Sequence, residues 1–170
     1  MEKSNIDYTE LIKSQKLTKP AIDDIIGLFL ERERLELAQN FLAFLREHGI
    51  NTRWASANKW MAGTACEIQL GGNKMAAGRT HFGVGDWHIA GLEGKKGIER
   101  EYLQQFIGDD EVVSFVHANI KACTRCASCG PRAIEYAGKM FDECCLFVIL
   151  NPDAKGLEIT KQLVLANKLY

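Results

Sequence analysis

Residues 117–131 read HANIKACTRCASCGP, and Cys144 and Cys145 follow at the start of an apolar run. Five of the six cysteines therefore lie between positions 123 and 145. Where thiols stay reduced, clustering of this kind indicates metal ligands or redox groups before disulfides. The stretch lies between a predicted helix and a predicted central strand, so it decides how those two elements are joined.

The N-terminal residues show no apolar core followed by a small-residue cleavage site, so we expect no signal peptide. No apolar run approaches the roughly 20 residues that span a bilayer. We therefore expect a cytoplasmic protein without a membrane partner. The net charge of −1 gives the molecule no general attraction for nucleic acid. A small molecule or another protein is the expected partner, and the sequence does not define the oligomeric state.

The apolar pattern predicts a single α+β domain over residues 1–170, with a loosely docked helix in residues 1–17. Helices are expected from Thr18, as the N-cap, to His48, and again over residues 98–107 and 109–120. Between them, residues 52–90 alternate and are predicted to form a three- or four-stranded antiparallel meander. The predicted fold is this β-meander packed against N-terminal, central and C-terminal helices, with a cysteine knuckle.

The last part of the chain predicts one more strand and one more helix. The run from Cys145 to Leu150 is apolar on both faces, which is typical of a central strand. Asn151, Pro152 and Asp153 then carry the signals of a helix start. The knuckle therefore connects the helix ending near residue 120 to a central strand.

The cysteine spacing favours a structural zinc site. Cys-x2-Cys-x2-Cys places three thiols on one turn, and structural zinc takes four soft ligands in a tetrahedron. Adjacent strand residues point to opposite faces, so only one cysteine of the later pair can join the same ion. Four thiolates leave no open position for water, so such a site stabilises the fold and is not catalytic. The predicted ligands are Cys123, Cys126, Cys129 and Cys145, with Cys144 or His117 as substitutes.

Other uses of the cysteines remain open. The iron–sulfur run of ferredoxins needs a fourth cysteine where this chain has Ala133, so that match fails. A thioredoxin-type Cys-x2-Cys pair begins a helix after a strand, whereas this one follows a helix. Free thiols without a metal, and a thiol-based redox or metal-responsive switch, stay as alternatives.

A second candidate site lies in the glycine-rich segment that follows residue 78. Trp, His, Arg and Asp side chains of the meander are types that line specific pockets, and glycine allows a ligand to approach the backbone. Asp86 and His88 are two residues apart and could form an acid–base pair on one strand face. The alternative is that the tryptophans close the core. The candidate ligand-binding residues are Arg53, Trp54, Trp60, His81, Asp86, Trp87 and His88.

Several of these features together resemble those of a group of short, uncharacterised bacterial proteins. The shared features are Trp54 and Trp60, the cysteine knuckle, residues 138–145 (GKMFDECC) and an Asn-Pro-Asp helix start. The resemblance covers residues 35–165 and implies that the last cysteine of the pattern is Cys145. Cys144 departs from the pattern and leaves that choice open. The group has no established activity, so the resemblance implies architecture and no mechanism.

Three functional hypotheses follow. The first is a non-catalytic zinc-stabilised domain that binds a small ligand or a protein through a surface rich in Trp, His and Gly. The second is a small enzyme that uses His81, Asp86 and His88 in an aromatic pocket. The third is the thiol-based switch.

Overall fold

The computed structural model describes residues 8–55, 63–69, 76–90, 101–122, 134–141 and 145–169. Its helices are α1 (Tyr8–Thr18), α2 (Ile22–Phe29), α3 (Arg32–Glu47), α4 (Glu101–Gln104), α5 (Asp110–Asn119) and α6 (Ala154–Leu169). Its strands are β1 (Thr52–Ala55), β2 (Gly63–Gln69), β3 (Ala76–Gly83), β4 (Trp87–Ala90), β5 (Ile120–Ala122), β6 (Ile134–Tyr136), β7 (Lys139–Phe141) and β8 (Cys145–Leu150).

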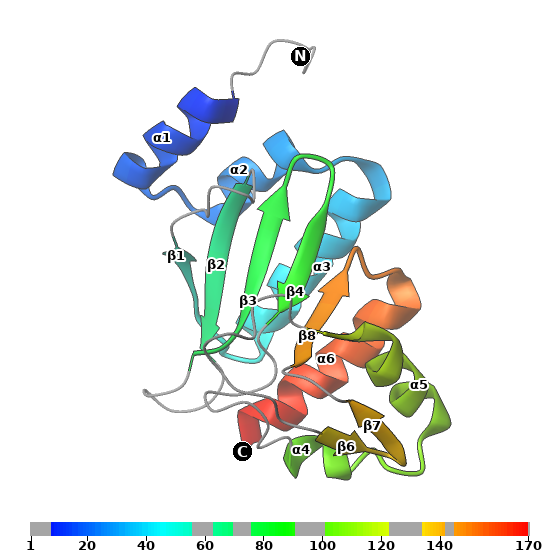
Figure 1. Ribbon diagram of the computed structural model, residues 1–170. Coiled ribbons are helices and arrows are strands. Elements are labelled where there is room, and N and C mark those ends of the chain that lie inside the picture. Colours follow the sequence, from blue (N-terminus) through cyan, green and yellow to red (C-terminus); the bar gives the residue numbers. More distant parts are fainter. Residues whose placement is uncertain are drawn as a thin grey trace.

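The predicted α+β class is confirmed (Figure 1). One sheet has the strand order β1-β2-β3-β4-β8-β5, and every neighbouring pair in it is antiparallel. The first four strands are the predicted meander. Strand β8 pairs with β4 on one side and β5 on the other, as predicted for a central strand. The knuckle part of the prediction falls largely outside the described residues.

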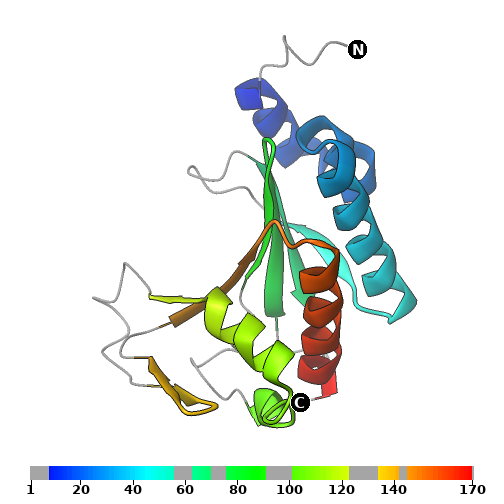
Figure 2. The same cartoon turned by 90° about the vertical axis from the view of Figure 1, so that its right-hand side faces the viewer.

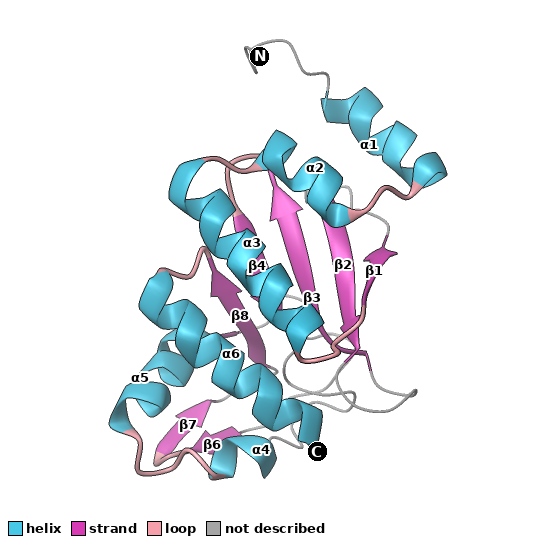
Figure 3. Cartoon of the chain, turned by 180° about the vertical axis from the view of Figure 1, so that it is seen from behind, coloured by secondary structure: helices cyan, strands magenta, loops and turns pink. Residues whose placement is uncertain are grey.

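Helices α2, α3 and α6 lie on one face of the sheet, as the edge-on view of Figure 2 and the rear view of Figure 3 show. The strand side chains on this inner face are buried, among them Phe82, Trp87, Ile89, Phe147 and Ile149. Trp87 is fully buried, and its ring centroid lies 6.0 Å from those of Phe41 on α3 and Phe82 on β3. The core therefore lies between the sheet and these helices.

Asn151 links the end of β8 to the start of β4 by hydrogen bonds, and the chain enters the last helix, α6, just after it. Its backbone N–H donates to the carbonyl of Trp87 at 2.9 Å, and its side-chain oxygen accepts from the Trp87 N–H at 2.8 Å. Asn151 has a positive φ of 42°, a conformation that asparagine tolerates better than most residues. Asp153 then accepts from the N–H of Gly156 at 2.7 Å and caps α6. The Asn-Pro-Asp sequence thus closes one strand pair and begins one helix.

Several helix boundaries differ from the sequence prediction. The helix expected over residues 98–107 ends at Gln104, the last residue of α4. Thr18 is not an N-cap, because it ends α1 and its hydroxyl donates to the carbonyl of Ser14 at 3.2 Å. Helix α2 begins after Ala21, with no side-chain cap. The helical conformation is then interrupted at Leu30, which is fully buried. Helix α3 starts at Arg32, which has a positive φ of 50°. Gly27 lies inside α2 and does not end it.

Three short strands were not predicted. The sequence places Ile120 in the helix before it, but α5 ends at Asn119 and Ile120 begins β5. Strands β6 and β7 form a separate hairpin whose turn holds Ala137 and Gly138 at positive φ. His117 on α5 anchors this hairpin, because its Nε2 lies 2.8 Å from the carbonyl oxygen of Tyr136. The Tyr136 hydroxyl donates to the carbonyl of Leu103 and so links the same hairpin to the residues of α4.

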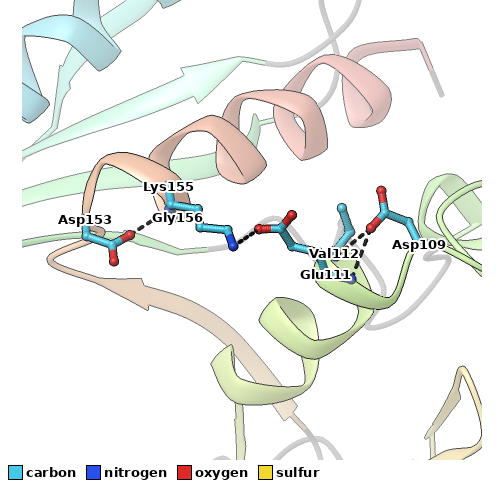
Figure 4. Close-up of polar contacts among 6 residues, drawn as sticks. All are labelled: Asp109, Glu111, Val112, Asp153, Lys155 and Gly156. Carbon is cyan, nitrogen blue, oxygen red and sulfur yellow. Dashed lines mark hydrogen bonds and ion pairs between the residues drawn. The ribbon is translucent and has the colours of Figure 1, made fainter.

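Helices α5 and α6 meet at their N-terminal ends (Figure 4). Asp109 accepts from the N–H groups of Glu111 and Val112, both at 3.1 Å, as the sequence predicted for a helix cap. Glu111 and Lys155 form an exposed ion pair between the two helices. The two helices pack closely at Gly156, because a Cβ placed there would lie 2.9 Å from the Phe115 ring.

We predict that Gly156→Ala destabilises the protein although alanine favours helix. The added methyl group must displace Phe115, and overpacking of this kind costs about 1–3 kcal/mol, whereas the gain in helix propensity is about 1 kcal/mol. Gly27→Ala is the matched control, because no atom lies within 4 Å of its Cβ position. Urea unfolding should show a loss of stability for Gly156→Ala and a gain of about 0.5–1 kcal/mol for Gly27→Ala. Equal effects would contradict the packing argument.

Candidate functional site

The outer face of the sheet, opposite α2, α3 and α6, carries the polar candidates. Strand residues alternate between faces, so His81 and Arg79 lie on the side opposite Thr80 and Phe82. His81 pairs directly with His88 in the β3–β4 register. Residue 67 of β2 is the register partner of both Arg53 and Arg79, so the two arginines share this face as well.

His81 and His88 form a stacked cross-strand pair. Their ring centroids are 4.6 Å apart and the ring planes differ by 15°. His81 is 6% exposed, whereas His88 is half-buried. The Nδ1 atom of His81 is buried and has no hydrogen-bond partner among the described residues. A buried polar atom without a partner costs about 1–3 kcal/mol, so a hydrogen bond from a ligand or a water molecule to this nitrogen would be favourable.

Both histidines are held in the neutral form near pH 7. Burial, followed by the charges of His88 and Arg79, lowers the pKa of His81 to about 4. Burial also lowers the pKa of His88, while the nearby carboxylate of Asp86 raises it. Neutral imidazoles can each donate one hydrogen bond and accept another. Each neutral ring therefore has a free lone pair and can accept a hydrogen bond or a proton without first releasing a proton.

Trp54 and Trp87 do not join this pair. Trp87 is fully buried on the inner face, because it neighbours His88 in β4 and adjacent strand residues point to opposite sides. Trp54 shares the inner face with Thr80, since both are register partners of residue 66. Trp87 therefore closes the core, which is the alternative that the sequence left open. An aromatic wall around His81 and His88 is not formed by either side chain.

The remaining candidate ligand-binding residues are Arg53, Asp86 and Trp60. Arg53 is exposed at the edge strand on the outer face, and Asp86 is exposed just before β4. Trp60 lies outside the described residues. Asp86 makes no hydrogen bond to His88 in the part of the chain that the structure describes, so their interaction is electrostatic. The residue that sequence reasoning missed is Arg79; its position two residues before His81 on an alternating strand was the available signal.

Most of the predicted metal ligands cannot be placed, because Cys123, Cys126, Cys129 and Cys144 lie outside the described residues. Cys145 is the first residue of β8, and its register partner is Ala122, the last residue of β5. Among the described residues, no three His, Cys, Asp or Glu side chains form a group that could hold a metal ion.

His117, the substitute ligand, packs within the β6–β7 region. Its ring contacts that of Tyr136 edge-on at 5.6 Å and that of Phe141 at 5.7 Å. Because its Nε2 faces the carbonyl oxygen of Tyr136, the neutral ring donates from Nε2 and keeps its lone pair on Nδ1. This arrangement is compatible with metal ligation through Nδ1, since ligating histidines commonly donate from the other nitrogen to a carbonyl.

One open cavity of about 460 Å³ lies where the β3–β4 turn meets the α2–α3 junction. Gly85, at a φ of 81°, donates its N–H to the carbonyl of Phe29 at 2.8 Å, and its own carbonyl accepts from Arg34. The polar groups of this turn are thus used to hold the turn against the helices. The cavity therefore lies beside a turn that is fixed to α2 and α3 through its backbone.

No family model, curated protein sequence or solved structure shows a significant match to this chain. None of the helices in the described ranges has both the length and the apolar content to cross a membrane.

We predict that stability falls as the pH is lowered from about 6.5 to about 4. Unfolded His81, with an ordinary pKa of 6.5, binds a proton in this range that the folded protein excludes, because its folded pKa is about 4. From these values, the free energy of unfolding should be about 2 kcal/mol lower at pH 5 than at pH 7 through this residue. Urea unfolding of His81→Gln at both pH values should show a correspondingly smaller loss. Equal losses in the two proteins would contradict the prediction.

Proposed function

We propose that this protein is a zinc-stabilised α+β domain that binds a small molecule or a protein partner through the outer face of its sheet. In this proposal a structural zinc is held by thiolates of Cys123, Cys126, Cys129 and Cys145. The metal connects the end of β5 to the start of β8. The ligand-binding part involves His81 and His88, together with the neighbouring arginines.

The pairing of Ala122 with Cys145 carries the zinc proposal. Opposed residues of an antiparallel pair have Cα atoms about 4.5–5.5 Å apart, and Cys123 is the next residue after Ala122 in the chain. Because Cys123 follows Ala122 and Cys144 precedes Cys145, the pairing supports a site in which the knuckle begins beside this pair of cysteines. A zinc ion with Zn–S distances of about 2.3 Å would then require only a local turn to gather the other thiolates.

The stacked histidines support binding rather than catalysis. His81 and His88 lie together, but Asp86 is exposed and makes no hydrogen bond to His88 within the described chain. A general acid–base pair needs the proton-transferring groups within hydrogen-bond reach of each other or of the substrate. The pair is therefore better suited to recognise a polar ligand than to activate a nucleophile.

Metal analysis of protein purified without added metal tests the zinc proposal. We expect about one zinc per chain, and a content below about half an equivalent would contradict it. Cys145→Ser should lose the metal and about 2–4 kcal/mol of stability, as expected when a ligand present at a hundred to a thousand times its Kd is removed. Cys66→Ser is the control, because Cys66 lies in β2, outside the cysteine cluster. It should retain the zinc.

Cys144→Ser decides between the two adjacent cysteines. If Cys145 is the fourth ligand, Cys144→Ser retains one zinc per chain and Cys145→Ser does not. The reverse result would assign the fourth ligand to Cys144. Loss of zinc in neither variant would favour His117, and His117→Gln would then release the metal.

A further inference from the structure

The outer face presents a row of nitrogen donors around one buried nitrogen. Arg79 lies two residues before His81 on β3, and His88 lies directly across from His81 on β4. The next strand positions on the far side of β4 belong to Val148 and Leu150 of β8, which cannot ionise. His81 and His88 are thus bordered by an arginine on one side and apolar residues on the other.

The Nδ1 atom of His81 is the group in this row that a ligand would complete. The side chain is more than nine-tenths buried, yet Nδ1 has no hydrogen-bond partner in the part of the chain that the structure describes. Buried side-chain polar atoms nearly always have a partner in folded proteins. The side chain of Arg79, by contrast, is exposed and makes neither an ion pair nor a hydrogen bond among the described residues. A ligand between these groups would satisfy both.

The local charge selects the kind of ligand. Burial first, and then the charges of His88 and Arg79, disfavour a positive charge on His81. Because His88 is itself neutral near pH 7, the positive charge next to His81 in this row is that of Arg79. Two acidic residues also belong to this region: Asp86 acts on His88, and Glu67 is the direct register partner of Arg79 on one side and of Arg53 on the other. A metal cation would be repelled at His81, whereas an anion would be attracted. The planar guanidinium of arginine matches carboxylate and phosphate oxygens in geometry.

We propose that the outer face binds an oxyanion, the carboxylate or phosphate group of a small ligand, between the guanidinium of Arg79 and the imidazole of His81. His88 supports the ring of His81 and adds a second donor. This inference rests on the ligand-binding part of the proposed function and is independent of the zinc site.

Imidazole NMR of the zinc-containing protein tests this inference. The pKa of His81 is measured with and without inorganic phosphate and, separately, acetate, and His81→Gln and His88→Gln assign the signals. A bound anion should raise the pKa of His81 by about one unit or more, because an opposite charge favours the protonated ring. A rise with phosphate alone identifies a phosphate ligand, and a rise with acetate identifies a carboxylate ligand.

Arg79→Gln should weaken the binding of that anion about tenfold, since it removes a charge-assisted hydrogen bond at the site. Arg46→Gln is the matched control, because Arg46 is an exposed arginine on α3 that pairs with Asp23, and it should bind the anion normally. The proposal is overturned if neither anion raises the pKa of His81, or if Arg79→Gln binds as well as the control. It is also overturned if zinc chloride binds here and lowers that pKa. The zinc content of the same samples reports separately on the cysteine site.

Discussion

The pairing of β4 with β8 is the contact on which the rest of the structure depends. It joins residues about sixty positions apart in the chain, and Asn151 reinforces it with two hydrogen bonds to the backbone of Trp87. Closing a loop of this length has an entropic cost that local hydrogen bonds alone do not offset. Burial of Trp87, Ile89, Phe147 and Ile149 beneath α3 and α6 supplies the additional stabilisation.

The same pairing separates two chemical environments by the thickness of one sheet. Trp87 and His88 are neighbours in sequence, but one lies in the apolar core and the other on the polar face. The rigid inner side fixes the backbone of β3 and β4. His81 and His88 are therefore held in register and stacked although α2, α3 and α6 all lie on the other side of the sheet, which is the preorganisation that the proposed binding site needs.

The parts of the fold that could be predicted were those in which apolar residues recur with a clear helical or strand spacing. The wide apolar stripe of α3, the alternation of the meander and the apolar run of β8 each identified one element, and Asp109 and Asp153 identified two helix starts. Strands β5, β6 and β7 have three residues each, too few to establish a period. Ile120 also continued the helical spacing of Val112 and Val116, so only its pairing with Phe147 made it a strand residue.

The candidate site was only partly predictable for a related reason. Histidines seven residues apart can meet only if the turn between their strands sets the right register, which Gly83 and Asp86 do through a backbone hydrogen bond of 2.9 Å. By contrast, the separation of Trp87 from His88 follows from strand alternation alone and needed no tertiary information. The isolation of the His81 nitrogen depends on packing from outside the strand, and no sequence pattern indicates it.

The strand order also matters while the chain is being synthesised. Strand β4 is complete at residue 90, but its partner β8 begins only at residue 145. At the usual speed of synthesis, about 5–20 residues per second, one edge of the meander waits roughly 3–11 s for that partner. Unpaired edges of this kind can recruit a second chain. Strand β5 waits for the same partner, so the last strand to leave the ribosome is the one that covers the open edges of both.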